Sequence, residues 1–208
     1  MNENYVDLGL SVKWSTCNIG ATKPNEFGDY FAWGETEPKD SYLLENYKLC
    51  VKVDSWIDVE YSKYNVEPGP KDKSVIIKGK IDNLRKLELD DDAAHKILEG
   101  KWRMPTIEEF MELRNKCKWN WTTIDKINGY IVSGKKPGFK DNFIFIPAAG
   151  YRSSSSYQNI GTHGYYWSRS VNDKNSNTAL YFSFNTERDG VYASSRSYGM
   201  TVRPVCEK

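Results

Sequence analysis

The chain has no long hydrophobic run and no excess of either charge. Its 208 residues contain no apolar stretch near the roughly 18 residues that a membrane span needs. Lys and Arg number 29 against 28 Asp and Glu, so the formal net charge is +1, and both signs are mixed along the sequence. This balance gives no electrostatic reason to expect binding to nucleic acid or to an anionic membrane.

Motifs of common catalytic and metal sites are missing as well. There is no P-loop, no dinucleotide fingerprint, no His-Glu-x-x-His and no Gly-x-Ser-x-Gly. The two histidines are His95 and His163, and no motif places an acid beside the serines at 153–156. The four cysteines are Cys17, Cys50, Cys117 and Cys206. They show no Cys-x-x-Cys spacing, which argues against a finger-type zinc site and leaves their disulfide state open.

Aromatic residues are abundant instead, with seven Trp and fourteen Tyr. They provide side chains for a core and for contact surfaces. The chain is also long enough to bury a stable core without disulfides or a structural metal ion. Residues 39–89 show a weak pattern and too few apolar side chains for a core of their own. We therefore expect one domain over residues 1–208, with a long excursion at about 39–89.

Two helices are predicted in the middle of the chain. Thr106 is placed as an N-cap and Glu109 completes a capping box, so a helix is expected over residues 107–116. An earlier helix is expected over residues 90–100, with acids in its first turn and Gly100 as its stop. The three adjacent aspartates at its start could be proposed as a calcium site. No glycine turn or spaced oxygen ligands follow them, which favours the helix.

Short strands account for most of the remaining pattern. We expect them within residues 5–14 (one strand or two), 30–35 (a core strand end or a packed loop), 74–79 (a short strand or a hairpin arm), 119–123, 130–132 and 143–146. A turn containing Asn128 and Gly129 is expected to join the two strands on either side of it. Many short strands with two helices predict the α+β class.

The last third of the chain has the composition of a binding surface. Alternation in residues 179–185 puts one Leu and two Phe on one face and Tyr181, Ser183 and Asn185 on the other. Tyr supplies contact area at low entropic cost, Ser and Asn adapt their hydrogen bonds, and Arg anchors charges. A ligand surface is therefore predicted from the loop at 151–163 and the strands at 181–198. The alternative is that these are ordinary solvent-facing residues of a sheet.

The candidate ligand-binding residues share this outward placement and these side-chain types. They are Tyr151, Arg152, Tyr157, Asn159, Tyr165, Tyr181, Ser183, Asn185, Arg188, Tyr192, Ser194, Arg196 and Tyr198. Of the neighbouring aromatic residues, Trp167 is expected in the core. Tyr165 and Tyr166 point opposite ways if the chain is extended, so at most one of them should be exposed.

Nine segments, in order, resemble the signature segments of a bacterial family, the Fibrobacter succinogenes major paralogous domain. They include DLGLSVKW, TCNIGA and GDYFAWGETEPK early in the chain, KWRMPTIEEFMEL in the middle, and IFIPAAGYR, GYYWS and YGMTVRPVC near its end. The match covers residues 5–206. That family resembles a branch of the C-type lectin-like superfamily. The resemblance implies paired N- and C-terminal strands, two helices, two small antiparallel sheets and a long loop region that carries the ligand surface.

Other members of that superfamily imply different functions. The helix start WRMPT also resembles formylglycine-generating enzymes, which use a pair of redox-active cysteines and a copper or calcium ion. Here only Cys206 lies in the final third, which disfavours that chemistry. Calcium lectins carry Glu-Pro-Asn or Gln-Pro-Asp and then Trp-Asn-Asp, whereas this chain has Asn172 and Asp173 without the Trp. The same helix start resembles the variable proteins of diversity-generating retroelements. The outward-facing residue types, Tyr, Ser, Asn, Asp and Arg, can all be encoded after substitution of adenines in AAC or AAT codons. Genetic diversification of this surface is therefore a hypothesis.

The reading favoured by the sequence is a non-catalytic domain that recognises a protein or a glycan without a metal or cofactor. One alternative is a structural or adhesive module of a bacterial surface protein, in which the same face packs on a neighbouring domain. A formylglycine-generating-type enzyme is the second alternative. The resemblance implies an exported or surface-attached product. The N-terminal MNENYVDLGL has neither a basic nor an apolar leader segment, so the protein is either cytoplasmic or begins after a removed signal.

Overall fold

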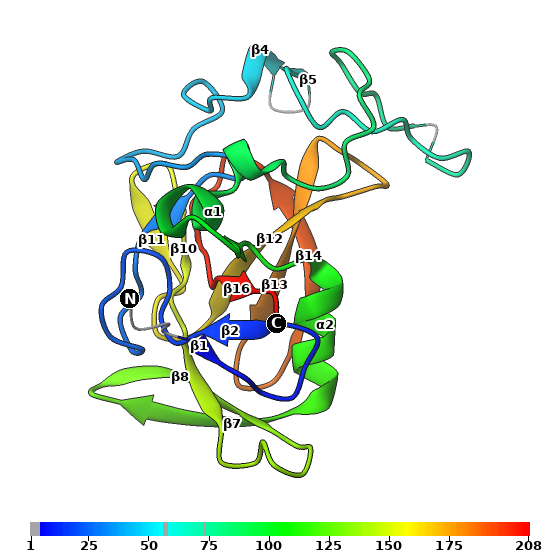
Figure 1. The fold of residues 1–208 in the computed structure, drawn as a ribbon. Coiled ribbons are helices and arrows are strands. Elements are labelled where there is room, and N and C mark those ends of the chain that lie inside the picture. Colours follow the sequence, from blue (N-terminus) through cyan, green and yellow to red (C-terminus); the bar gives the residue numbers. More distant parts are fainter. Residues whose placement is uncertain (1–4, 56–57, 73) are drawn as a thin grey trace.

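A computed structural model describes residues 5–55, 58–72 and 74–208 as small sheets with two α-helices and one 3₁₀ turn (Figure 1). The helical elements are η1 (Leu89–Asp91), α1 (Ala93–Leu98) and α2 (Ile107–Lys116). The strands are β1 (Tyr5–Val6), β2 (Lys13–Ser15), β3 (Tyr30–Phe31), β4 (Cys50–Ser55), β5 (Asp58–Tyr61), β6 (Trp102–Arg103), β7 (Cys117–Ile124), β8 (Ile127–Gly134), β9 (Phe143–Pro147), β10 (Tyr151–Ser153), β11 (Ser156–Gln158), β12 (Gly164–Val171), β13 (Thr178–Phe184), β14 (Asp189–Ser195), β15 (Met200–Thr201) and β16 (Val205–Cys206). The predicted α+β class is confirmed.

The strands form a five-stranded central sheet and smaller sheets around it. The central sheet has the order β14-β13-β12-β15-β3, in which only β12 and β15 run parallel. A four-stranded sheet has the order β1-β2-β16-β6, and a three-stranded sheet has the order β7-β8-β9. Two hairpins, β4–β5 and β10–β11, complete the set. In Figure 1 the β7–β8 hairpin and the β4–β5 hairpin lie at opposite ends of the molecule.

The two ends of the chain are joined in the four-stranded sheet. Strand β16 pairs with β2, with Val205 opposite Trp14, so the expected pairing of N- and C-terminal strands is observed. The guanidinium of Arg203, which is fully buried, donates to the carbonyl oxygens of Ser15 (3.1 Å) and Phe145 (2.8 Å). This side chain therefore links the chain's beginning, its end and the three-stranded sheet.

The central sheet buries both faces, each in its own hydrophobic cluster. On one face, Phe182 and Phe184 of β13 pack with Phe110 of α2. On the other face, Trp167 and Ala179 pack with aromatic residues from the first third of the chain and from residues 39–89. Successive residues of a strand point to opposite faces, which is why the alternating pattern in β13 separates these clusters. The expected two-sided pattern and the core placement of Trp167 are confirmed.

Residues 39–89 form the excursion, and they cover part of the second face. Their buried side chains join the cluster around Trp167, and they are Tyr42, Tyr47, Leu49, Val59, Tyr61, Tyr64, Val66 and Leu87. Burial of a large apolar side chain stabilises a fold by about 1.5–3 kcal/mol. The excursion is therefore held by a core that it shares with the sheet. Its predicted strand at 74–79 was wrong, because only Lys78 in this stretch makes a bridge, to Glu60.

Arg196 ties the excursion to the end of the central sheet. Its side chain is fully buried and donates to the carbonyl oxygens of Lys63 (2.9 Å), Tyr64 (2.5 Å) and Ser176. The guanidinium also lies 4.4 Å from the centroid of the Tyr61 ring. A cation out of water is costly unless hydrogen bonds replace its hydration, and here main-chain oxygens and an aromatic face do so.

The two helices follow their capping signals. In α2, the Thr106 side chain accepts from the Glu109 backbone and Glu109 accepts from the Thr106 backbone, which confirms the predicted capping box. Helix α1 is shorter than predicted, because Asp92 is its N-cap and accepts from two backbone N–H groups of the first turn. The two preceding aspartates belong to the 3₁₀ turn η1. Neither helix in the described part of the chain is long and apolar enough to cross a membrane.

The turn between β7 and β8 lies earlier than predicted. Asp125 and Lys126, with φ of 47° and 69°, form the two-residue turn, and Asn128 and Gly129 belong to β8. A two-residue hairpin turn of type I′ needs positive φ at both central residues, and here non-glycine residues adopt it. Gly129 serves a different purpose, because a Cβ there would lie 2.4 Å from the Ile146 carbonyl oxygen.

The buried position of Arg196 leads to a stability prediction. We expect Arg196→Ala to lower the free energy of unfolding by about 2–4 kcal/mol, because it leaves buried carbonyl oxygens without a donor. The excursion should also become more sensitive to limited proteolysis. Urea unfolding and mass-spectrometric mapping of the cleavage sites measure these two effects.

The matched control is Arg188→Ala, because Arg188 is an exposed arginine at the start of the same hairpin arm. This change should alter stability by no more than about 0.5 kcal/mol. Equal stability of the two variants would show that Arg196 does not hold the excursion in place.

Candidate functional site

Five tyrosines from the last third of the chain lie in a continuous row, which we call the tyrosine row: Tyr198, Tyr151, Tyr165, Tyr181 and Tyr192. The ring centroids of successive members are 5.7, 4.9, 5.8 and 6.0 Å apart, within the usual range for interacting aromatic rings. The row crosses strands β12, β13 and β14 and is extended by β10 and the turn after β14.

The sheet register explains why these side chains meet. Tyr181 and Tyr192 are direct cross-strand partners in β13 and β14. Tyr181 also lies opposite Trp167, whose side chain shares the face of Tyr165 two residues before it. The neighbouring Tyr166 is fully buried on the opposite face, so only one of the adjacent tyrosines borders solvent, as expected.

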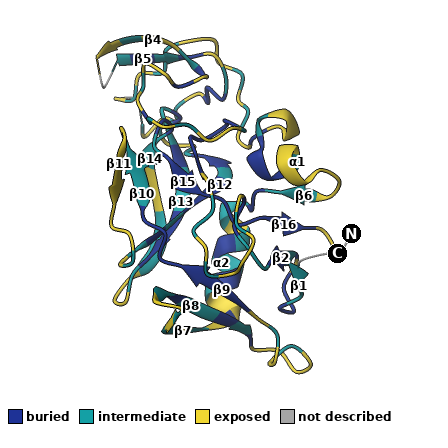
Figure 2. Ribbon diagram, turned by 90° about the vertical axis from the view of Figure 1, so that its left-hand side faces the viewer, coloured by how far each residue is buried: buried dark blue, intermediate teal, exposed yellow. Residues whose placement is uncertain are grey.

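Four tyrosines of the row pack one side on the core, and all five remain partly accessible. Tyr151, Tyr165, Tyr181 and Tyr198 are half-buried against the cluster around Trp167, whereas Tyr192 is 47% exposed. Figure 2 shows half-buried and exposed residues along β14 and the β10–β11 hairpin, beside the buried centre of the sheet. The row is therefore a fixed surface, supported from below by the core.

Polar side chains hold the central member of the row, Tyr165, in place. The amide nitrogen of Asn159 donates to the Tyr165 hydroxyl (2.9 Å), and the His163 ring stacks on Tyr165 at 5.9 Å between centroids. The Asn185 side chain lies 3.0 Å from Nε2 of His163. Burial raises the pKa of Tyr181 to about 12. The Tyr181 hydroxyl therefore stays neutral at physiological pH and can both donate and accept hydrogen bonds.

The structure separates the candidate residues into two groups. Arg152 and Tyr157 are cross-strand partners in the β10–β11 hairpin, and their side chains lie on the face of that hairpin opposite Tyr151. Arg152 stacks over the Tyr157 ring at 4.7 Å and donates to the carbonyl oxygens of Lys39 (3.0 Å) and Asp40 (2.6 Å). The hairpin therefore presents Tyr151 to the tyrosine row and these two residues to a different surface.

Three other candidates do not fit the predicted roles. Arg196 is fully buried and holds the excursion, so its prediction as an exposed anchor was wrong. Ser183 is only 7% exposed, because it lies between Tyr165 and Gly190 in the sheet, and its predicted exposure was also wrong. Asn185 accepts from the backbone of Glu187 and Arg188, so its oxygen forms the turn before β14.

Of the remaining two candidates, one lies beside the row. Ser194 is half-buried and lies two residues after Tyr192 on the same face of β14. Arg188 is exposed in the turn that leads into β14.

Arg152 and Tyr157 line a pocket of about 260 Å³ with residues that the sequence analysis missed. The other lining residues are Gly28, Asp29, Tyr30, Pro38, Lys39, Asp40 and Tyr42. They come from parts of the chain more than 100 residues before the hairpin, and no local motif signals their meeting. Two exposed carboxylates and three aromatic side chains make this pocket polar in character.

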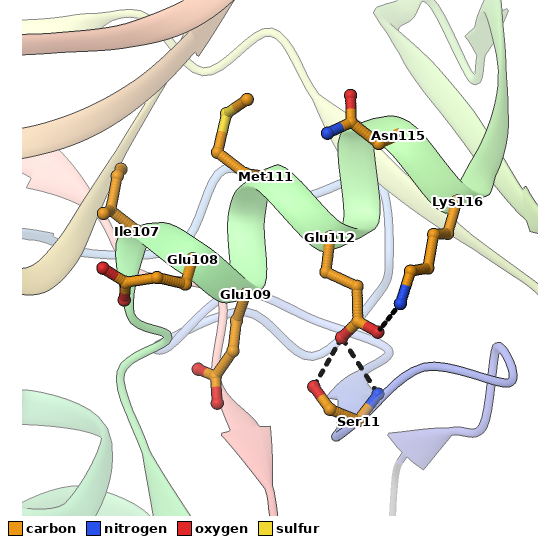
Figure 3. Close-up of a pocket in the computed structure, with 8 residues that line it drawn as sticks. All are labelled: Ser11, Ile107, Glu108, Glu109, Met111, Glu112, Asn115 and Lys116. Atoms are coloured by element: carbon orange, nitrogen blue, oxygen red, sulfur yellow. Dashed lines mark hydrogen bonds and ion pairs between the residues drawn. The ribbon is translucent and has the colours of Figure 1, made fainter.

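A second hollow, of about 530 Å³, lies along the outer side of α2 (Figure 3). Figure 3 shows Glu112 pointing to Ser11, while Met111 points to the other side of the helix. The Glu112 carboxylate accepts from the Ser11 backbone (3.0 Å), the Ser11 hydroxyl and Lys116 Nζ (2.9 Å). Helix α2 packs on the face of the central sheet opposite the tyrosine row, so the two surfaces are separate.

Titratable residues outside these surfaces have structural partners. Asp92 accepts from the backbone of Ala94, His95 and Met104, and Asp91 accepts from Lys63 and Tyr64. These bonds use both carboxylate oxygens of Asp92 and one of Asp91. In the described residues, no group of three or more His, Cys, Asp or Glu side chains is arranged to hold a metal ion.

No disulfide links the four cysteines, all of which lie in the described residues. Burial raises the pKa of the Cys117 thiol to about 11 and raises that of Cys50 as well. Protonated thiols are poor nucleophiles.

No family model, no curated protein and no solved structure matches this chain. The resemblance noted in the sequence stays an expectation, and the geometry of the surfaces is the basis for a functional proposal.

The contacts of Glu112 predict a pH dependence of stability. Burial by itself would raise the pKa of this carboxyl, but the hydrogen bonds from Ser11 and Lys116 outweigh it and lower the pKa to about 2. The ionised group therefore stabilises the fold fully above its unfolded pKa of about 4.3, and this stabilisation is lost as the pH falls towards 2. We expect Glu112→Gln to lower the Tm by about 2–4 °C at pH 7 and by almost nothing near pH 2.

Thermal unfolding between pH 2 and pH 7 checks this, with Glu108→Gln as the control on the same helix. Glu108 is exposed, so its substitution should leave the Tm almost unchanged at every pH. A loss for Glu112→Gln that is equal at both ends of the pH range would contradict the lowered pKa.

Proposed function

We propose that this protein is a non-catalytic ligand-binding domain, and that it recognises a protein or a glycan through the tyrosine row without a metal ion. The observation that carries the proposal is the row itself, in which five tyrosines from distant parts of the last third are in ring-to-ring contact and remain partly accessible.

The chemistry of tyrosine supports this role. A tyrosine ring offers a large amphipathic contact area, and its hydroxyl both donates and accepts hydrogen bonds. Four of these rings are already packed against the core on one side, so a ligand would order few side chains when it binds. Asn159 and Ser194 add amide and hydroxyl groups beside the rings. The combination is typical of surfaces that bind uncharged or mixed polar partners.

We also propose that the fold is C-type lectin-like and that the protein is exported or attached to a cell surface. Three features support the fold assignment: the paired terminal strands, the capped helix α2 and the long excursion beside the candidate surface. The proposed location follows from the family resemblance, with a cytoplasmic location as its alternative.

A binding experiment with single substitutions tests the proposed function. The protein is applied to arrays of bacterial and host glycans and of surface proteins, with and without EDTA. For any ligand found, Tyr192→Ala and Tyr181→Ala should each weaken the affinity at least about tenfold, because central aromatic contacts contribute on the order of 2 kcal/mol. Binding should be unchanged by EDTA.

The matched control is Tyr157→Ala, because Tyr157 is an equally exposed tyrosine on the other face of the β10–β11 hairpin. It should change the affinity less than about twofold. Equal losses in all three variants would place the binding site elsewhere, and loss of binding in EDTA would favour a calcium lectin. Concentration-dependent self-association that is abolished by Tyr192→Ala would favour the structural or adhesive module.

A further inference from the structure

Strand β14 ends the central sheet next to the tyrosine row. It is the outermost strand in the order β14-β13-β12-β15-β3, and no strand in the described part of the chain pairs with its outer side. In Figure 1 it lies at the outer side of the β12–β13 pair. Tyr192, the most exposed member of the row, belongs to this strand.

The hydrogen-bond pattern shows which backbone groups of β14 face outward. Residues of an antiparallel pair alternate between partners that exchange hydrogen bonds and partners that do not. Asn185 N donates to Arg188 O at the start of the hairpin, so the exchanging positions in β14 are Gly190, Tyr192 and Ser194. The backbone groups of Val191 and Ala193 therefore point away from β13.

The other end of the strand gives the same assignment. The carbonyl oxygen of Ser195 accepts from Tyr198 N, and Thr178 N donates to Asn175 O, although Ser195 and Thr178 are cross-strand neighbours. Both groups find partners in turns, as expected for a pair that does not exchange hydrogen bonds. In contrast, no hydrogen bond within the described residues uses the backbone groups of Val191 or Ala193 on the outer side.

This edge lacks the features that usually prevent strand addition. Natural edge strands are commonly protected by charged side chains, proline, bulges or a covering segment. The one charge in β14 is Asp189 at its first position, which pairs with Arg114; from residue 190 to residue 195 the strand has no charge and no proline, and its register with β13 is unbroken. The edge strands β4 and β7 differ, because β4 contains Lys52 and Asp54 and β7 contains Lys118.

We propose that the partner of the tyrosine row is a polypeptide, and that an uncharged extended segment of this partner adds to the central sheet as a strand along β14. This inference rests on the proposed function and narrows its ligand to protein. The backbone groups of Val191 and Ala193 would bind the main chain of the added strand, as in other cases of β-strand addition.

The side chains beside the edge define the sequence preference of such a segment. Alternate residues of the added strand would lie beside Tyr192 and Ser194 on the row face, and the others beside Val191 and Ala193 on the opposite face. These neighbours carry no charge, so burying a charged side chain among them would be unfavourable. A glycan has hydroxyl donors and acceptors but no main chain whose N–H and C=O groups repeat at the spacing of a strand.

Selection from a random peptide library displayed on phage, with the 208-residue chain as bait, provides the probe. Affinities of the selected peptides are then measured for the wild type and for two substitutions at one position. Ala193→Pro removes the outward N–H and leaves the β13–β14 hydrogen bonds in place, whereas Ala193→Ser keeps the N–H. We expect at least a tenfold loss of affinity for Ala193→Pro and less than a twofold change for Ala193→Ser.

Amide hydrogen exchange measured by NMR gives a readout that needs no substitution. In the free protein, the amides of Val191 and Ala193 should exchange rapidly, while those of Tyr192 and Ser194 are protected. A bound peptide should slow exchange at Val191 and Ala193. If these two amides are protected in the free monomer, or if protection appears only on dimerisation, the proposed occupant is wrong.

Some outcomes would contradict strand addition along β14 but would leave the proposed ligand-binding function of the tyrosine row unaffected. A ligand that is weakened by Tyr192→Ala but is equally bound by Ala193→Pro and Ala193→Ser would keep the row and exclude strand addition. A glycan as the only ligand found, or failure of the library to yield a binding peptide, would also overturn it. Peptides that bind along β14 but are insensitive to Tyr181→Ala and Tyr192→Ala would instead contradict the role of the row.

Discussion

The buried guanidinium of Arg196 is the interaction on which the arrangement of the candidate surface depends. It lies at the end of the hairpin that carries β14 and donates to carbonyl oxygens of Lys63, Tyr64 and Ser176. Burial lowers the pKa of this guanidinium because it disfavours the charged form. The excursion must therefore stay docked to keep the cation solvated by main-chain oxygens. The docked excursion covers part of the face of the central sheet that carries Trp167, and the rest of that face remains accessible to solvent.

The tyrosine row lies at the boundary between the covered part and the accessible part of this face. Trp167 is fully buried in the covered part, while Tyr181, which contacts it, borders the accessible part. Four of the five rings contact the core and each ring contacts a neighbour, so the row is largely fixed in position. Rigidity lowers the entropic cost of binding, and the adjacent unpaired edge of β14 adds backbone donors and acceptors to the same surface.

The sequence predicted best where the signal was local. The capping box at Thr106 and Glu109 needs only neighbouring residues, and the alternation in β13 needs only the period of a strand. The turn was predicted at Asn128 and Gly129 because this residue pair commonly forms tight hairpin turns. In the structure the pair lies inside β8 instead. There the glycine was required by the close approach of the Ile146 carbonyl, which is a tertiary constraint.

The sequence by itself determined the α+β class, the capped helix, and the face of β13 on which Tyr181 lies. Only the tertiary structure decided which polar and aromatic side chains on that face remain accessible. Arg196 and Tyr192 belong to the same hairpin arm and have equally favourable types for a binding surface, yet one is fully buried and the other is 47% exposed. The difference arises because the excursion, far away in the sequence, covers Arg196 and stops short of Tyr192. Periodicity specifies a face, whereas coverage of that face depends on long-range packing.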